Sequence, residues 1–103
     1  MKQTPSQILL ALHLRELGFC RPCFEFPVCA GRRWRFDIAV PAERLAFEIS
    51  GGNWTGGHRR GKAQESEYDK LNYAQMDGWR VIQWTNRQVL SGEAKQWLKE
   101  HFT

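Results

Sequence analysis

The chain has 103 residues, a formal net charge of +4 and 13% aromatic residues, which describes one small globular domain with a densely filled core. No apolar run approaches the roughly 20 residues of a membrane span. The residues after Met1 and Lys2 show neither the apolar stretch nor the cleavage site of a secretory signal. We therefore expect a cytoplasmic protein with no membrane partner, in which Cys20, Cys23 and Cys29 are free thiols.

The positive charge is concentrated in the middle of the chain. Residues 31–62 contain seven basic and three acidic side chains, whereas the segments before and after carry net charges of +1 and −1. A basic segment of this kind indicates a polyanionic partner.

A helix and three strands are predicted in the first half of the chain. Thr4-Pro5-Ser6-Gln7 has the pattern of a capping box with proline in the first turn, so a helix is predicted over about 5–17. Alternating apolar residues and flanking turn residues then predict three strands, at 23–29, 34–40 and 45–49. Short turns join these strands, which favours an antiparallel meander.

The second half alternates between irregular and regular segments. Five glycines in residues 51–61 exclude a regular element there. A helix is predicted over 62–77, with Tyr68, Leu71 and Ala74 near one face, followed by a strand at 79–84 that should pair in parallel with an earlier strand. A last helical stretch, 86–101, should be interrupted near Ser91-Gly92. The predicted fold is a single α/β domain over 1–103, with the order α-β-β-β-α-β-α and a mixed sheet flanked by helices.

Two carboxylates interrupt apolar strands. Asp37 lies in Trp34–Val40 and Glu48 in Leu45–Ser50, and neighbouring strands of a hairpin can bring such residues together. Paired carboxylate oxygens suit Mg²⁺ or Mn²⁺. The alternative is that each carboxylate forms an ion pair with an arginine, the candidates being Arg33, Arg35 and Arg44.

The glycine-rich loop begins immediately after the second acidic strand. Glycines allow backbone N–H groups to approach phosphates, and nearby cations attract them; the cations here are His58, Arg59, Arg60 and Lys62. Trp54 either stacks on a base or belongs to the core. The alternative is a solvated surface loop.

The acidic strands and this loop together resemble a known superfamily. The stretches Arg32–Pro41, Leu45–Gly52 and Gly56-Gly57-His58 look like those of small phage- and prophage-encoded nucleases of the PD-(D/E)XK, or restriction-endonuclease-like, superfamily. The likeness continues through Asp69-Lys70-Leu71-Asn72 and Gly78-Trp79-Arg80-Val81 and covers most of the chain. Very-short-patch repair endonucleases and Holliday-junction resolvases are more distant members.

The resemblance implies a metal-dependent DNA endonuclease of a bacterial or phage-infected cell. Asp37 and Glu48 match its acidic ligands for Mg²⁺ or Mn²⁺, and the carbonyl of Ile49 would be a further ligand. Ser50 occupies the place where the superfamily commonly has a catalytic lysine. Lys70 is the candidate replacement, although it could equally pair with Glu67 three residues away.

A second departure lies in the first helix, where Gln7 stands in the region that often carries a metal-binding glutamate. Gln7 could bind a metal-bound water but is a poor direct ligand. Two functions therefore stay open: an endonuclease, acting on plain, branched or repair DNA, and a degenerate nuclease fold that binds nucleic acid without cleaving it. In either case the arginines at the second strand, Arg32, Arg33 and Arg35, belong to the expected DNA-binding set. Cleavage of both strands or of a junction would require a homodimer.

Overall fold

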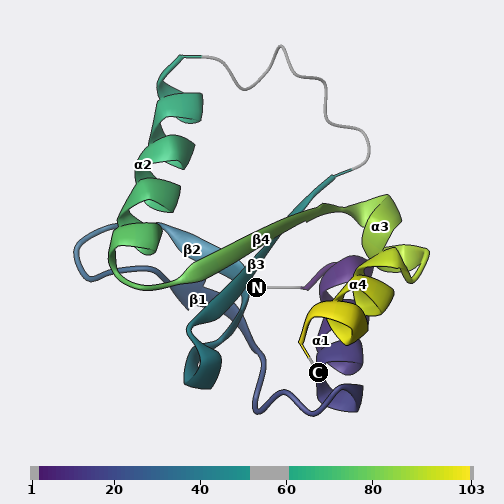
Figure 1. Ribbon diagram of the computed structural model, residues 1–103. Coiled ribbons are helices and arrows are strands. Elements are labelled where there is room, and N and C mark those ends of the chain that lie inside the picture. The colour runs from purple at the N-terminus through teal and green to yellow at the C-terminus, as the bar shows by residue number, and fades with distance from the viewer. Residues whose placement is uncertain (1–2, 52–60, 103) are drawn as a thin grey trace.

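The sheet has four strands in the order β1–β2–β3–β4, with helices on both of its faces (Figure 1). The computed structural model describes residues 3–51 and 61–102. The strands are β1 (Cys23–Pro27), β2 (Arg35–Val40), β3 (Leu45–Ser50) and β4 (Arg80–Thr85), and the helices are α1 (Pro5–Glu16), η1 (Pro41–Glu43), α2 (Lys62–Met76), α3 (Asn86–Leu90) and α4 (Glu93–His101). β1, β2 and β3 pair antiparallel, and β4 pairs in parallel with β3, as the sequence predicted.

The helix ends follow from local sequence. Thr4 caps α1 and Thr85 caps α3, each in a reciprocal capping box with a glutamine three residues later. The interruption predicted near Ser91-Gly92 is present, because Gly92 has a φ of +92° and separates α3 from α4.

Two apolar clusters fix the layers of the fold. The larger cluster lies between the sheet and the group formed by α1, α3 and α4, and its largest fully buried side chains are Leu10, Leu14, Ile38, Leu45, Phe47 and Leu98. The smaller cluster includes Ala39 and Ala46 of the sheet and Ala74 of α2. Helix α2 therefore lies against the opposite face from the other helices (Figure 1).

Several local predictions differ from the structure. The turn predicted at 41–44 is a short 3-10 helix, and Arg44 closes it with a φ of +50°. On α2, Ala74 is buried and Leu71 half-buried, as predicted, but Tyr68 is 54% exposed. The prediction was wrong for Tyr68 because Lys70, rather than an aromatic residue, reaches the interior. In the part of the chain that the structure describes, no helix is long and apolar enough to cross a membrane.

Candidate functional site

The two strand carboxylates come together where β2 and β3 separate. The pairing of these strands ends at Ile38 and Phe47, and the next position in that register holds Asp37 and Glu48. The Asp37 backbone N–H donates to Glu48 Oε2 at 2.9 Å, and the Ile49 backbone N–H donates to Asp37 Oδ2 at 2.7 Å. Each carboxylate thus satisfies a main-chain donor of the neighbouring strand, which holds both side chains in fixed positions.

Lys70 supplies the cation of this site. Its side chain is 8% exposed and extends from α2, donating from Nζ to Glu48 Oε1 and to the carbonyl oxygen of Arg35 at 3.0 Å. A second carboxylate, Glu67, lies 3.4 Å from the same ammonium group. The two alternatives for Lys70 are therefore not exclusive, since it contacts Glu48 and Glu67 at once.

The predicted arginine partners of the acidic pair are wrong. Arg35 Nη1 donates to the Glu25 carbonyl oxygen at 3.1 Å, and Arg44 pairs with Asp77 at 3.2 Å. Both contacts lie on exposed parts of the surface, where a long guanidinium side chain stays hydrated. The cation that contacts the acidic pair is instead Lys70, which extends from α2.

Burial dominates the acid–base behaviour of the site. It raises the pKa of Glu48 to about 7, and hydrogen bonding to Lys70 offsets only part of this effect. Burial also raises the pKa of Asp37, against the hydrogen bond from Ile49 that favours its charged form. The pKa of Lys70 is raised because the contacts with Glu48 and Glu67 outweigh the cost of burying its charge. Burial therefore shifts Glu48 and Asp37 towards their protonated forms, and the contacts with Lys70 act in the opposite direction.

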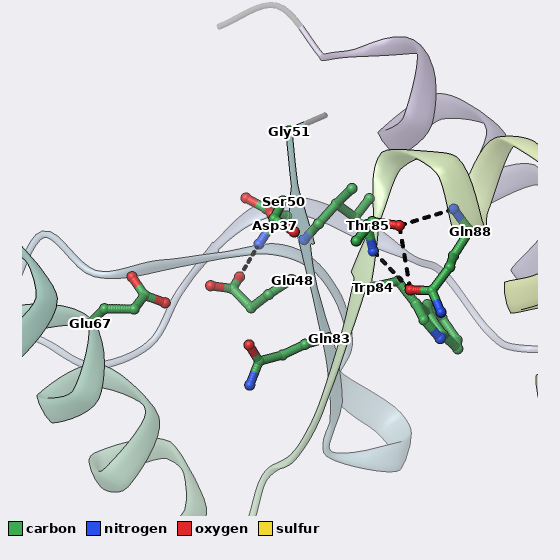
Figure 2. Close-up of a pocket in the computed structure, with 10 residues that line it drawn as sticks. Asp37, Glu48, Ser50, Gly51, Glu67, Gln83, Trp84, Thr85 and Gln88 are labelled. Atoms are coloured by element: carbon green, nitrogen blue, oxygen red, sulfur yellow. Dashed lines mark hydrogen bonds between the residues drawn. The ribbon is translucent and has the colours of Figure 1, made fainter. Parts of the chain in front are cut away.

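The acidic pair lines a pocket of about 550 Å³ (Figure 2). Its walls come from β3, β4 and α2, and the lining residues are Asp37, Glu48, Ile49, Ser50, Gly51, Glu67, Gln83, Trp84, Thr85 and Gln88. Ser50 and Ile49 therefore lie at the predicted place, at the exposed end of β3. The pocket gives a substrate direct access to the carboxylates.

Gln7 holds a fourth carboxylate, Glu25, near the site. Its amide nitrogen donates to Glu25 Oε2 at 2.9 Å and to the Asp37 carbonyl oxygen at 3.4 Å, while its Oε1 accepts from the Thr4 backbone N–H. Gln7 is only 5% exposed. Both ends of the amide are engaged within the protein, so Gln7 positions Glu25 and the second strand.

The remaining predicted residues are exposed cations of the described chain and residues of the glycine-rich loop. Arg32, Arg33, Arg35 and Lys62 are all exposed, and the Arg32 guanidinium lies 4.5 Å from the ring centroid of Trp34. Trp54, His58, Arg59 and Arg60 lie outside the described residues. Cys20, Cys23 and Cys29 are free thiols, as predicted.

Sequence reasoning missed Glu25 and Gln83, and it named Glu67 only as the alternative partner of Lys70. Glu25 occupies the β1 position across from Asp37, between the pairs Phe24–Ile38 and Phe26–Phe36, and its φ of +51° removes it from regular pairing. The alternation in residues 23–29 placed it on the polar side of its strand, and a register argument across the sheet would have brought it beside Asp37. Nothing in the sequence fixes the register of β4, which carries Gln83.

The carboxylate oxygens of the site fit a hard divalent cation whose remaining ligands are not protein side chains. Oδ1 of Asp37 accepts no hydrogen bond from a described residue, and Asp37 lines the pocket together with Glu48 and Glu67. Within residues 3–51 and 61–102, no group of three His, Cys, Asp or Glu side chains could enclose a metal ion. Mg²⁺ commonly binds through one or two carboxylates and completes its shell with water and phosphate oxygens.

The fold is similar to that of an endonuclease catalytic domain whose structure is known. The solved structure of the homing endonuclease I-Bth0305I catalytic domain matches it with a TM-score of 0.68 over 95% of this chain and 93% of that one, at 18% sequence identity. At this identity the likeness concerns the fold alone. A comparison with protein-family models and with curated proteins gives no match for this chain.

Proposed function

We propose that the chain is a metal-dependent DNA endonuclease that hydrolyses phosphodiester bonds. The observation that carries the proposal is the pair Asp37 and Glu48, held by reciprocal main-chain hydrogen bonds at the edge of an open pocket, with Lys70 beside them. The shared fold with an endonuclease catalytic domain supports it. Fold stability alone does not explain a buried lysine between two glutamates and beside an aspartate. Replacing buried ion pairs by apolar residues often leaves the stability of a protein unchanged or raises it.

Mg²⁺ or Mn²⁺, held by Asp37, Glu48 and the Ile49 carbonyl, would supply positive charge against the developing charge of the phosphate. Asp37 is kept rigid by the Ile49 N–H and presents its other oxygen to the pocket. Lys70 is anchored on the Arg35 carbonyl, so its ammonium can orient the attacking water or stabilise the leaving oxygen. Ser50, which has no charge, leaves this role to Lys70.

DNA would approach along the exposed basic residues near the pocket. Arg33 and Arg35 lie at the start of β2, and Lys62 begins α2. These cations, with Arg32 and the predicted phosphate-binding loop, would neutralise the backbone on both sides of the acidic pair. A protein of this size spans about one turn of DNA, so cleavage of both strands would use a homodimer.

Incubation of plasmid, linear and branched DNA with Mg²⁺ or Mn²⁺ tests the proposal. We expect cleavage that depends on the metal and falls by at least about a hundredfold in Asp37→Asn and Glu48→Gln. Glu100→Gln, which removes an exposed carboxylate on α4, is the matched control and should retain activity. Cleavage that survives both pocket substitutions would refute the proposal, and the substrate cut fastest defines the DNA structure recognised.

The second candidate is a nuclease fold that binds nucleic acid without cleaving it. The engagement of both ends of the Gln7 amide within the protein favours it, because helix α1 then offers the metal no ligand at this position. This function predicts salt-dependent DNA binding that needs no divalent cation and is unchanged in Glu48→Gln. Metal binding lost in Glu48→Gln would count against it.

A further inference from the structure

Gln83 lies beside Glu48 on the neighbouring strand. The parallel register of β3 and β4 pairs Glu48 with Gln83, and paired residues of adjacent strands project from the same face, with backbones about 4.8 Å apart. Trp84, the next residue along β4, is buried on the opposite face against α3 and α4. The alternation along β4 thus directs Gln83 towards the pocket.

The Gln83 amide is available to a ligand. The side chain is exposed and lines the pocket, and among the described residues it has no hydrogen-bond partner. Figure 2 shows it extending from β4 beside Glu48, with its amide directed towards the side on which Glu67 lies. Gln88, another glutamine at this pocket, accepts the Thr85 backbone N–H instead.

A neutral donor suits this position better than a charged one. The pocket holds Asp37, Glu48 and Glu67 against the single buried ammonium of Lys70, so its described groups favour a cation. A lysine or arginine next to Glu48 would form an ion pair with it and compete with a metal. An amide can donate to a phosphate oxygen without taking the place of the cation.

We infer that Gln83 is a substrate-binding residue whose Nε2 donates a hydrogen bond to a non-bridging oxygen of the DNA phosphodiester at the acidic pair. The inference rests on the proposed function for the reaction, but it concerns a binding contact and can be measured without cleavage. Gln83 and Glu48 have side chains of the same length on adjacent strands, so they can reach one phosphate group from two sides. The substrate group contacted is the backbone phosphate, so the contact is independent of base sequence.

The test compares Gln83→Met, which keeps the shape but removes the donor, and Gln83→Glu, which adds a negative charge. Binding to a labelled duplex is measured by fluorescence anisotropy with Ca²⁺ in place of Mg²⁺, and cleavage is measured in single turnover with Mg²⁺. We expect Gln83→Met to weaken binding by roughly tenfold, and Gln83→Glu to weaken it more. Gln75→Met, an exposed glutamine of α2 outside the pocket, is the control and should bind like the wild type.

Two further readouts separate this contact from a general loss of structure or charge. The salt dependence of binding should be unchanged in Gln83→Met, because no counterion is released by a neutral group, and Mn²⁺ affinity should also be unchanged. Binding and cleavage within twofold of the wild type in Gln83→Met would overturn the inference, as would a wild type that binds no DNA. A wild type that binds without cleaving, with weaker binding in Gln83→Met, would refute the endonuclease while supporting the contact.

Discussion

Replacement of Lys70 by methionine tests whether the buried ammonium stabilises the folded protein by compensating the negative charge of the acidic pair. Methionine retains most of the length of the side chain but removes the charge and all three polar contacts, to Glu48, Glu67 and the Arg35 carbonyl. The perturbation therefore leaves Glu48 beside Asp37 with no cation among its described contacts.

The loss of unfolding free energy caused by Lys70→Met should depend strongly on pH. The folded-state pKa of Glu48, about 7, lies above its ordinary value of 4.5, so the folded protein retains a proton that the unfolded chain loses between these two values. The unfolding free energy of the metal-free wild type therefore falls as pH rises from 4.5 to 7 and then levels off. Without Lys70 the pKa of Glu48 rises further. The unfolding free energy then continues to fall above pH 7, by about 1.4 kcal/mol for each unit by which this pKa rises.

We expect Lys70→Met to lower the unfolding free energy by about 2 kcal/mol at pH 8, because the folded variant still retains the Glu48 proton there at a cost of about 1.4 kcal/mol per pH unit above 7, in addition to the lost hydrogen bonds. At pH 5, where Glu48 is protonated in both proteins, the loss should be below about 1 kcal/mol. Urea denaturation of the metal-free protein at both pH values measures the difference, and the pH 8 loss corresponds to a fall in Tm of roughly 8 °C or more. Lys99→Met, at an exposed position on α4, is the control. Equal losses for Lys70→Met at pH 5 and pH 8 would refute the reasoning.

Three other predictions concern protons, the Gln7 contacts and the basic surface. Because Glu48 must lose its proton to bind a cation, Mn²⁺ affinity should rise by up to about tenfold per pH unit below pH 7 and flatten above it; a calorimetric titration with no pH dependence would contradict this. Gln7→Ala should cost about 2 kcal/mol in urea denaturation, since it removes the side-chain half of the α1 capping box and the part-buried contact to Glu25, and a loss below about 0.5 kcal/mol would show that these contacts contribute little. Arg33→Ala should reduce the slope of log affinity against log salt by about 1, whereas Lys99→Ala should leave the slope unchanged; equal slopes in both variants would place Arg33 away from DNA.

The sheet and its acidic pair could be predicted because both depend on local sequence. The alternation of apolar residues predicted the strands, and short turns between them left little freedom of pairing. Asp37 and Glu48 were expected to meet because a short turn places their strands side by side in a hairpin. The capping boxes, which involve residues three apart, were equally visible.

The partners of the acidic pair could not be predicted with the same certainty. Lys70 reaches Glu48 only because α2 packs against the sheet with its lysine inward, and periodicity favoured Tyr68 on that side. Gln83 depends on the register of a parallel pair whose strands are joined through α2, so no turn fixes their alignment. The position of Glu25 depends on a positive φ in the middle of a strand. A glutamate in the sequence does not indicate such a backbone conformation.

The separation of these residues along the chain has a consequence for the order of folding. Asp37 and Glu48 are eleven residues apart and meet in an antiparallel hairpin, whereas Lys70 follows Glu48 by 22 residues and comes from beyond a crossover. The shorter loop closes at a lower entropic cost, so the hairpin is expected to form before α2 docks. During that interval the carboxylates lack their internal cation. Docking of α2 supplies the positive charge that the hairpin lacks, so the acidic pair gains its charge balance late in folding.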